Sequence, residues 1–432
     1  MTMKTTSTLD VPAHDSAAAK AVASFCREGH TPPGPAVRAS LPASDVWAAM
    51  TRAGTALWLD TGDVAATQKL WTKEFTALTT NNTLLNKEVQ KGIYDQLVPE
   101  AVAMVRQAVS GISDTRLVQE VAFVLNAVHG LKLVRTFDAD VSVELHTDVA
   151  DDVEASYRYG KRFHSICPDR FIVKVPLTPA GLLAARKLHD DGIRVNFTLG
   201  FSARQNWLIA LVARPSWVNV FMGRLNSFVA DRGLGDGNNV GEKATLSSQR
   251  LLRKVNQEHH LAVRQIGASI RSGQQVADLA GLDTLTIPTS AAAEFVKLGL
   301  APAAIEDRTD DDPTVSFAAG IDPAAEGLDV FWSQDGKMAT AMASLAKQDT
   351  AKLTPDGVRS FLRDHGVPGL FPDLSAADVR AIVEDGKIPS YERWTARAKQ
   401  RSADWDGLFT VSALQSFAVD QKALDDRIRG LI

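Results

Sequence analysis

The stretch FIVKVPLTPAGLLAARKLHDDGIRVNFTL (171–199) decides the fold. It begins with a short apolar run at 171–175, continues at 180–190 with apolar residues at helical spacing, and ends with a second β-branched run at 194–199. Two such runs separated by a helix are typical of a βαβ unit, whose strands are parallel. Because the first run is almost continuously apolar, we expect helices to cover the outer face of its sheet.

The same alternation continues on both sides of this unit, from about residue 55 to residue 300. Eight runs predict strands: ALWLD (56–60), FTALTT (75–80), VSVEL (141–145), FIVKV (171–175), RVNFTL (194–199), WVNVFM (217–222), RQIGAS (264–269) and DTLTI (283–287). Three helical patterns fill the long interval 81–140. Eight βα units over roughly 230 residues predict an α/β protein with a TIM (β/α)8 barrel, to which C-terminal helices are added.

The segments outside the strands suggest the domain boundaries. The expected parts are an N-terminal arm at 1–40, partly disordered, with a helix near 16–26 and a breaker TPPGP at 31–35; the barrel at 41–300; an acidic, flexible connection at 301–327; and a helical region at 328–432 that holds an insert near 345–410 and a closing helix near 412–430. Trp394 and Trp405 could pack the insert onto the barrel, where it would serve as a lid or an oligomer contact.

The composition is that of a soluble globular protein. The chain has 432 residues, of which 45% are hydrophobic and 23% charged, and its net charge is −4. A slightly acidic chain has no bulk reason to bind nucleic acid or an anionic membrane, so a phosphate ligand would need local arginines. No run approaches about 18 consecutive apolar residues, and no apolar region follows the first lysine. We therefore expect a cytoplasmic protein.

Lys174 is the most informative residue, because it lies within a predicted strand between Val173 and Val175. A buried lysine needs a partner or a task. Burial disfavours the ammonium form, and a neutral amine can attack a carbonyl carbon to form a Schiff base. The alternative is a lysine at the end of a strand whose side chain reaches solvent.

Polar residues also stand near the ends of other predicted strands. Asp60 ends the first strand, Asn81 follows the second, Glu144 lies near the end of the third, and Asn196 and Thr198 lie on the fifth. A barrel brings the carboxyl ends of its strands to one mouth, where active sites form. Separately, each residue could be a cap or a turn residue. Together they predict a Schiff-base site with acid and base partners.

Two arginines are candidates for anion binding. Arg224 closes the sixth strand, and Ser269 and Arg271 close the seventh. Guanidinium groups at the mouth can hold a phosphate through paired, charge-assisted hydrogen bonds. Surface salt bridges are the alternative for either arginine alone. The histidines, including the adjacent His259 and His260, lack metal-ligand spacing, so we expect no metal site.

Taken together, these residues resemble the motifs of the transaldolase family, in the family's order. The motifs are LDTGD (59–63), TTN (79–81), VSVE (141–144), FIVKV (171–175), NFTLGFS (196–202), FMGR (221–224), GASIR (267–271), AGLDTLTI (280–287) and, as the closing helix, LQSFAVDQKALDDRI (414–428). The resemblance covers roughly 55–300 and the terminal helix. It implies a barrel of the class I aldolase type.

The resemblance also implies catalytic roles for four residues. Lys174 matches the lysine that forms the Schiff base. Asp60 matches the residue that takes the proton from the C4 hydroxyl during carbon–carbon cleavage. Glu144 and Thr198 match the pair that holds a catalytic water.

Substrate-binding roles are implied for a second set of positions. Asn81 and Asn196 match amides that orient dihydroxyacetone, and Thr79 belongs to the same motif as Asn81. The phosphate-binding positions are Arg224, Ser269 and Arg271.

Three positions depart from the family's pattern. Asn82 stands in the place of a proline, which loosens a turn. Asn219 replaces a serine and could still bind a substrate hydroxyl, so we include it in the substrate site. His146 stands where the family often has an acid. These changes bear on substrate preference more than on chemistry.

The implied activity is the transfer of a dihydroxyacetone unit from a ketose phosphate (sedoheptulose 7-phosphate or fructose 6-phosphate) to an aldose phosphate (glyceraldehyde 3-phosphate or erythrose 4-phosphate). The reaction belongs to the non-oxidative pentose phosphate pathway and needs no cofactor. The partners would be sugar phosphates, and a homodimer stays open. Two alternatives are an enzyme of the fructose-6-phosphate aldolase type, which releases free dihydroxyacetone, and a non-catalytic sugar-phosphate-binding protein. Glu144 favours the transferase, because the aldolases are expected to carry glutamine there.

Overall fold

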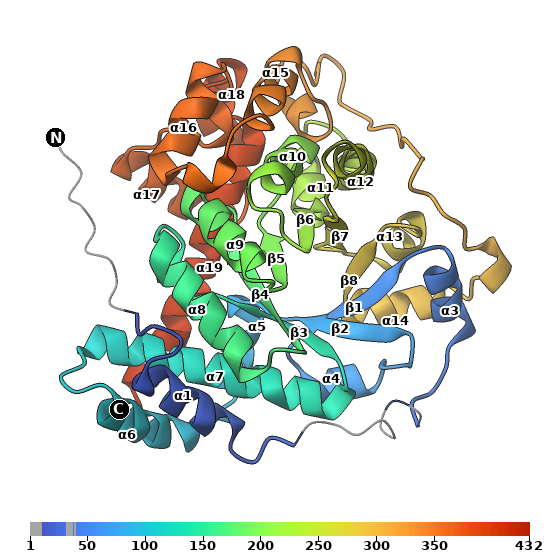
Figure 1. Cartoon of the computed structure of the whole chain (residues 1–432). Coiled ribbons are helices and arrows are strands. Elements are labelled where there is room, and N and C mark those ends of the chain that lie inside the picture. The colour runs from blue at the N-terminus through green and yellow to red at the C-terminus, as the bar shows by residue number, and fades with distance from the viewer. Residues whose placement is uncertain (1–10, 32–37, 39) are drawn as a thin grey trace.

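The computed structural model describes residues 11–31, 38 and 40–432. Its centre is a closed barrel of eight parallel strands in sequence order, in which β8 pairs with β1 (Figure 1). The strands are β1 Ala56–Asp60, β2 Phe75–Thr79, β3 Asp140–Glu144, β4 Phe171–Pro176, β5 Val195–Thr198, β6 Trp217–Phe221, β7 Arg264–Ala268 and β8 Thr284–Pro288. The predicted TIM barrel is confirmed, and each strand lies within about one residue of its predicted bounds.

Helices cover the outside of this barrel. They are α3 Asp45–Arg52, α4 Val64–Gln68, α5 Asn82–Gln90, α6 Leu97–Ala108, α7 Asp114–Phe137, α8 Val153–Ile166, α9 Pro179–Asp190, α10 Ala203–Val212, α11 Met222–Asp231, α12 Val240–His259, α13 Gly273–Asp278 and α14 Thr289–Lys297, with a 3₁₀ turn η1 at Thr147–Val149. The three helical patterns predicted in 81–140 are α5, α6 and α7. Helix α7 is long and apolar enough to cross a membrane, but 89% of its apolar window is buried in the protein. It is a core helix.

Alternation along the strands divides the core in two. Outward side chains such as Val173 and Val175 pack under the helices. Inward side chains form a separate apolar cluster, which contains Trp58, Ile172 and Trp217. The rings of Trp58 and Trp217 meet edge to face with their centroids 4.9 Å apart. This cluster fills the barrel below the next inward residues along the strands, which are polar.

The N-terminal segment contains the expected helix. Helix α1 (Ala17–Arg27) begins at Ser16, whose side chain accepts a hydrogen bond from the Ala19 N–H. It packs against α6, α7 and α8 outside the barrel. Residues 1–10, 32–37 and 39 of the expected arm, including most of the TPPGP motif, lie outside the described residues.

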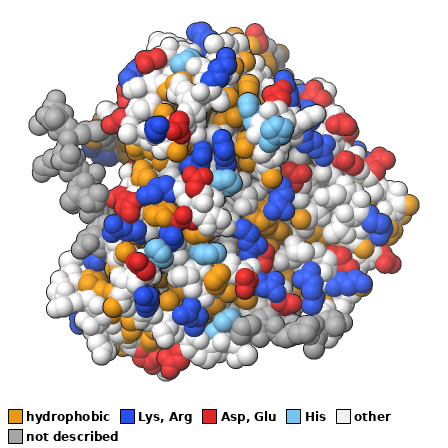
Figure 2. All heavy atoms as spheres, viewed as in Figure 1, with side chains coloured by type: hydrophobic (Ala, Val, Ile, Leu, Met, Phe, Trp, Pro, Cys, Tyr) orange, Lys and Arg blue, Asp and Glu red, His pale blue; other side chains and the backbone are white. Residues whose placement is uncertain are grey.

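Beyond α14 the chain forms short helices and one long one. They are η2 Pro302–Ala304, η3 Leu328–Phe331, α15 Gly336–Leu345, η4 Thr350–Lys352, α16 Pro355–Asp364, η5 Pro368–Leu370, α17 Ala376–Asp385, α18 Tyr391–Lys399 and α19 Trp405–Arg429. Helices α15 to α18 form one group in Figure 1, with α15 packed on α10 and α16 on α9. Helix α19 runs from this group across the barrel to α5 and α7. On the face drawn in Figure 2, acidic and basic side chains are intermixed.

A buried charge cluster fixes the start of α19 to the barrel. Arg204 on α10 donates hydrogen bonds to Asp404 at 2.7 Å and to both carboxylate oxygens of Asp406 at 2.6 and 2.8 Å. All three residues are at most 2% exposed. Ser202 adds a hydrogen bond to Asp406, and Trp405 packs on Phe228 of α11 with a centroid distance of 4.8 Å. Trp405 therefore packs this region onto the barrel as predicted, whereas Trp394 bonds within the insert to Asp385.

Replacing Arg204 with methionine should lower the free energy of unfolding by about 3–5 kcal/mol, because the buried Asp406 would lose its counter-ion and Asp404 would keep only Arg401. The matched change Arg429→Met removes an exposed ion pair with Asp426 on α19 and should cost at most about 1 kcal/mol. Denaturant unfolding followed by circular dichroism measures both. Equal losses in the two variants would contradict this role of the cluster.

Candidate active site

Polar side chains converge on one cavity at the carboxyl ends of the strands. The cavity has a volume of about 180 Å³. Nine of the eleven residues proposed from the sequence line it: Asp60, Thr79, Asn81, Lys174, Asn196, Asn219, Arg224, Ser269 and Arg271. The other two, Glu144 and Thr198, are buried in the barrel near it. The topology brings them together because parallel strands deliver their last residues to the same end of a barrel.

Lys174 lies at the floor of the cavity and is 4% exposed. Strand pairing places it opposite Glu144 on β3 and Asn196 on β5. Its Nζ atom is 3.6 Å from Glu144 Oε2 and donates a hydrogen bond to the Thr80 carbonyl oxygen at 3.2 Å. Lys174 is thus a buried amine facing a cavity, with a carboxylate as its neighbour. The alternative interpretation of the sequence, in which the Lys174 side chain reaches bulk solvent, is wrong.

Glu144 is buried, and its surroundings favour the protonated form. Its Oε2 atom accepts no hydrogen bond. Burial raises the pKa of Glu144 above the ordinary value, and the charge of Lys174 only partly offsets this. Glu144 also borders a separate cavity of about 10 Å³, which is lined mainly by residues of α7 and α8. A carboxyl group next to an amine can take up a proton from it and return one to it.

Asp60 stands across the cavity floor on β1. Thr79 donates a hydrogen bond of 2.7 Å to Asp60 Oδ1, and Thr79 Oγ1 lies 2.6 Å from Thr286 Oγ1. Burial raises the pKa of Asp60, while Lys174 and the Thr79 hydroxyl act in the opposite direction. The side chain is therefore held in one orientation and is a better proton acceptor than an ordinary aspartate.

The polar side chains of β5 and β6 are only partly satisfied by hydrogen bonds. Asn196 donates to Ser142 Oγ at 3.1 Å, and Asn219 donates to Asn196 Oδ1 at 3.5 Å, a weak contact. Among the described residues, Thr198 Oγ1 and Asn219 Oδ1 are buried without a partner. Buried polar atoms are normally satisfied, so unsatisfied ones beside a cavity suit a hydroxylated ligand or water.

Two arginines, Arg224 and Arg271, line the same cavity and are called the arginine wall below. Arg224 begins α11, is 7% exposed, and forms no ion pair among the described residues. Burial and the charge of Arg271 lower the pKa of Arg224 to about 10. Gly223 makes room for Arg271, because a Cβ there would lie 2.6 Å from Arg271 Nε. Two neighbouring guanidinium groups without a carboxylate partner form a site for an anion, and Ser269 lines the same wall.

The sequence did not point to several lining residues. Phe417 on α19 lies with its ring centroid 6.0 Å from Lys174 Nζ, and Lys387 comes from the loop between α17 and α18. Thr286 could have been found, since it is an inward-facing polar residue near the end of β8. Phe417 lies in the closing-helix motif, which gave no hint of the contact. Lys387 lies in the insert, where no sequence pattern indicated a site.

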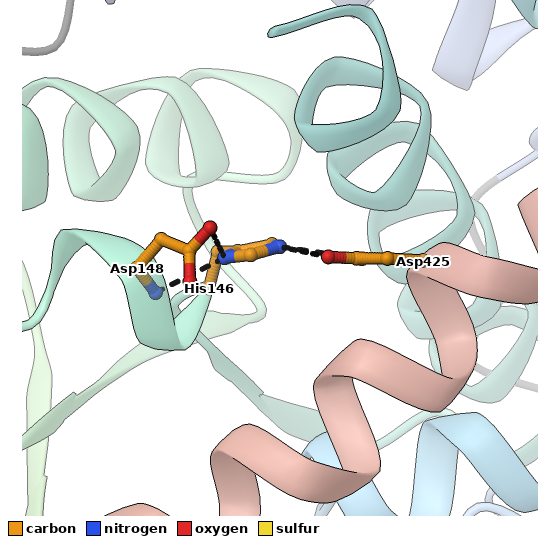
Figure 3. A group of neighbouring side chains, drawn as sticks. All are labelled: His146, Asp148 and Asp425. Carbon is orange, nitrogen blue, oxygen red and sulfur yellow. Dashed lines mark hydrogen bonds and ion pairs between the residues drawn. The ribbon is translucent and has the colours of Figure 1, made fainter. Parts of the chain in front are cut away.

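His146 fastens α19 near this site. Its Nδ1 atom accepts a hydrogen bond from the Asp148 N–H at 3.1 Å, and its Nε2 atom lies 3.3 Å from both carboxylate oxygens of Asp425 (Figure 3). These three side chains form the one group among the described residues whose ligand atoms could share an ion. The two ring nitrogens, however, face opposite sides. Because Nδ1 accepts a hydrogen bond, the neutral ring carries its proton on Nε2 and donates it to Asp425. The three residues thus form a hydrogen-bonded link between η1 and α19.

Fold and cavity define a class: a (β/α)8 barrel that carries a buried amine and two carboxylates at its mouth. A profile of the transaldolase/fructose-6-phosphate aldolase family matches residues 57–366, and the chain belongs to this family. It is 29% identical over 234 residues to a transaldolase of Xanthomonas euvesicatoria pv. vesicatoria, covering 53% of this chain and 71% of that protein. It is 34% identical over 170 residues to a probable transaldolase of Thermus thermophilus (38% and 67%) and 27% identical over 318 residues to a transaldolase of Edwardsiella ictaluri (72% and 93%).

The raised pKa of Asp60 predicts how stability depends on pH. Because the folded protein keeps the Asp60 proton to a higher pH than the unfolded chain does, ionising this carboxyl destabilises the fold. This loss of folding free energy is absent below the pKa that Asp60 has in the unfolded chain. It grows as the pH rises from there through the pKa that Asp60 has in the folded protein. Asp60→Asn should therefore melt at a higher temperature than the wild type at pH 8, and the difference should shrink towards pH 4.

Scanning calorimetry at several pH values between 4 and 8 measures this difference. The exposed residue Asp231, at the end of α11, provides the control Asp231→Asn, whose effect should be small across that range. If the stability difference between Asp60→Asn and the wild type grows towards pH 4, the pKa of Asp60 is lowered on folding and the prediction is wrong.

Proposed function

We propose that the protein is a transaldolase, a transferase of ketone residues. It moves a dihydroxyacetone unit from sedoheptulose 7-phosphate or fructose 6-phosphate to glyceraldehyde 3-phosphate or erythrose 4-phosphate, as a cytoplasmic step of the non-oxidative pentose phosphate pathway. The observation that carries the proposal is the buried Lys174 amine, 3.6 Å from Glu144, in a cavity whose wall holds Arg224 and Arg271. Family membership supports it.

The reaction begins at the lysine. Neutral Lys174 Nζ adds to the ketose carbonyl carbon to give a carbinolamine. The carbinolamine oxygen leaves as water after taking up a proton, and the nitrogen lone pair forms the protonated imine. Glu144 is placed to carry these protons, with a water held by Thr198. Dividing a difficult transfer into covalent steps lowers each barrier.

Carbon–carbon cleavage follows from the position of Asp60. Asp60 takes the proton of the C4 hydroxyl, the C3–C4 electron pair moves into the imine, and the aldose phosphate leaves with a new C4 carbonyl group. The enamine stays bound to Lys174, while Asn81 and Asn196 orient its hydroxyl groups. An acceptor aldose phosphate then enters, and the steps reverse.

The phosphate end of the substrate binds at the arginine wall. Arg224, Arg271 and Ser269 can surround a phosphate with charge-assisted hydrogen bonds. Phe417 supplies an apolar surface near the lysine, which limits the access of water to the enamine. An enamine shielded from water and a glutamate rather than a glutamine at position 144 both favour transfer to an acceptor over release of free dihydroxyacetone.

Borohydride reduction in the presence of fructose 6-phosphate should trap the reduced dihydroxyacetone unit on the peptide that carries Lys174. Lys174→Met should form no adduct and lose all detectable turnover, and Asp60→Asn should lower kcat by roughly 10²–10⁴-fold because its general base is gone. Intact-mass and peptide mass spectrometry measure the adduct. A folded wild-type protein that yields no adduct with any of these ketose phosphates would overturn the proposal.

The same assay separates a transferase from an aldolase. With fructose 6-phosphate alone, glyceraldehyde 3-phosphate should be released in an amount close to that of the enzyme, and steady turnover should need erythrose 4-phosphate. Release of free dihydroxyacetone at the same rate without an acceptor would identify an aldolase.

Arg271→Lys should raise the KM for fructose 6-phosphate by about 10- to 100-fold, because an ammonium group cannot reproduce the paired hydrogen bonds of a guanidinium. The control Arg264→Lys changes an arginine at the opposite end of β7, where it stacks on Trp217. It should leave KM within about twofold of the wild-type value. Steady-state kinetics that show equal KM values for wild type and Arg271→Lys would remove Arg271 from the phosphate site.

A further inference from the structure

The insert reaches the active cavity through one residue. Lys387 lies in the short loop between α17 and α18, far along the chain from the strands, yet it lines the cavity together with Arg224 and Arg271. Its backbone carbonyl oxygen accepts a hydrogen bond of 3.1 Å from Arg224 Nη1. The insert therefore contacts the arginine wall directly and holds one of its guanidinium groups in place.

Hydrogen bonds hold the loop that carries Lys387 to α18 and α19. Gly386 adopts a positive φ of 83°, and its carbonyl oxygen accepts a hydrogen bond of 2.6 Å from Ser412 of α19. Asp385 accepts hydrogen bonds from the Ser390 N–H at 3.0 Å and from Trp394 Nε1 at 2.7 Å. The backbone of Lys387 is thus fixed before any ligand binds, which lowers the entropic cost of binding.

The Lys387 side chain has no counter-ion among the described residues. It is exposed and takes part in none of their ion pairs. It also borders a second cavity of about 260 Å³ between α17 and α19. Asp420 lines that cavity too, but its carboxylate accepts a hydrogen bond from Thr83. Lys387 therefore lines the same cavity as two arginines that also lack carboxylate partners among the described residues.

We infer that the insert completes the phosphate end of the substrate site, with Lys387 as a third cation that binds the substrate phosphate and its carbonyl oxygen as the group that positions Arg224. This inference rests on the proposed function and names the part of the insert that serves it. Three cations around one dianion favour phosphorylated over unphosphorylated ketoses. The insert acts as a wall of the active site.

The test is Lys387→Met, which removes the ammonium group but keeps the chain length and the backbone carbonyl that Arg224 needs. We expect the KM for fructose 6-phosphate to rise about 5- to 20-fold, as for the loss of one charge-assisted hydrogen bond at a partly exposed site. The inhibition constant of inorganic phosphate should rise by a similar factor. Lys387→Arg should restore both constants to within about threefold. The control Lys347→Met, at an exposed lysine just beyond α15, should change neither.

Borohydride trapping with dihydroxyacetone, which carries no phosphate, keeps this inference separate from the proposed function. Trapping by the wild type tests the Schiff base alone. If the wild type traps dihydroxyacetone but Lys387→Met binds fructose 6-phosphate and phosphate as tightly as the wild type, the proposed function stands and the role of Lys387 is overturned. If no adduct forms, calorimetric titration of fructose 6-phosphate still shows whether binding depends on Lys387. An equal loss of affinity for fructose and for fructose 6-phosphate would also contradict a role in phosphate binding.

Discussion

Two ionisable groups on neighbouring strands, Lys174 and Glu144, lie 3.6 Å apart inside the barrel, and each is almost fully removed from water. Taking an ammonium or a carboxylate group out of water costs several kcal/mol, which the pair recovers only if its geometry is held. The parallel register of β3 and β4 supplies that geometry, because it sets the two residues side by side. The apolar layer around Trp58 and Trp217 closes the barrel beneath them. The site is thus a polar layer standing on an apolar one.

The mouth of the barrel is covered by a helix from the C-terminal region. The low exposure of Lys174 requires a cover over the open end of the barrel. Helix α19 supplies it with Phe417, and α19 is held along its length by different contacts: the Arg204 cluster at its start, and His146 at Asp425 towards its end. Like charges left unpaired at Arg224 and Arg271 work against stability. The well-packed frame tolerates this cost, which is typical of functional sites.

The barrel was predictable because two periodicities agree. Continuous β-branched runs such as 171–175 separated by helical segments indicate parallel strands, and every second residue faces inward. That parity places Asp60, Glu144 and Lys174 in one layer, so the core of the candidate site follows from sequence once the barrel is assumed. The contacts of α19 and of the α17–α18 loop do not follow. Phe417 and Lys387 reach the cavity through packing between segments far apart in sequence, and no local pattern encodes that packing.

The segment between α15 and α19 brings one residue, Lys387, to the cavity at the mouth of the barrel. Helices α16 to α18 lie in this segment, and both α15 and α19 pack on barrel helices. The two ends of this segment are therefore held by α15 and α19, and the entropic cost of closing a longer loop grows only slowly with its length. The barrel strands keep their register while the insert adds one loop at the rim. The strands carry the buried Lys174 and Glu144, whereas Lys387 comes from a loop at the rim, so residues can be added at the rim without moving the strands.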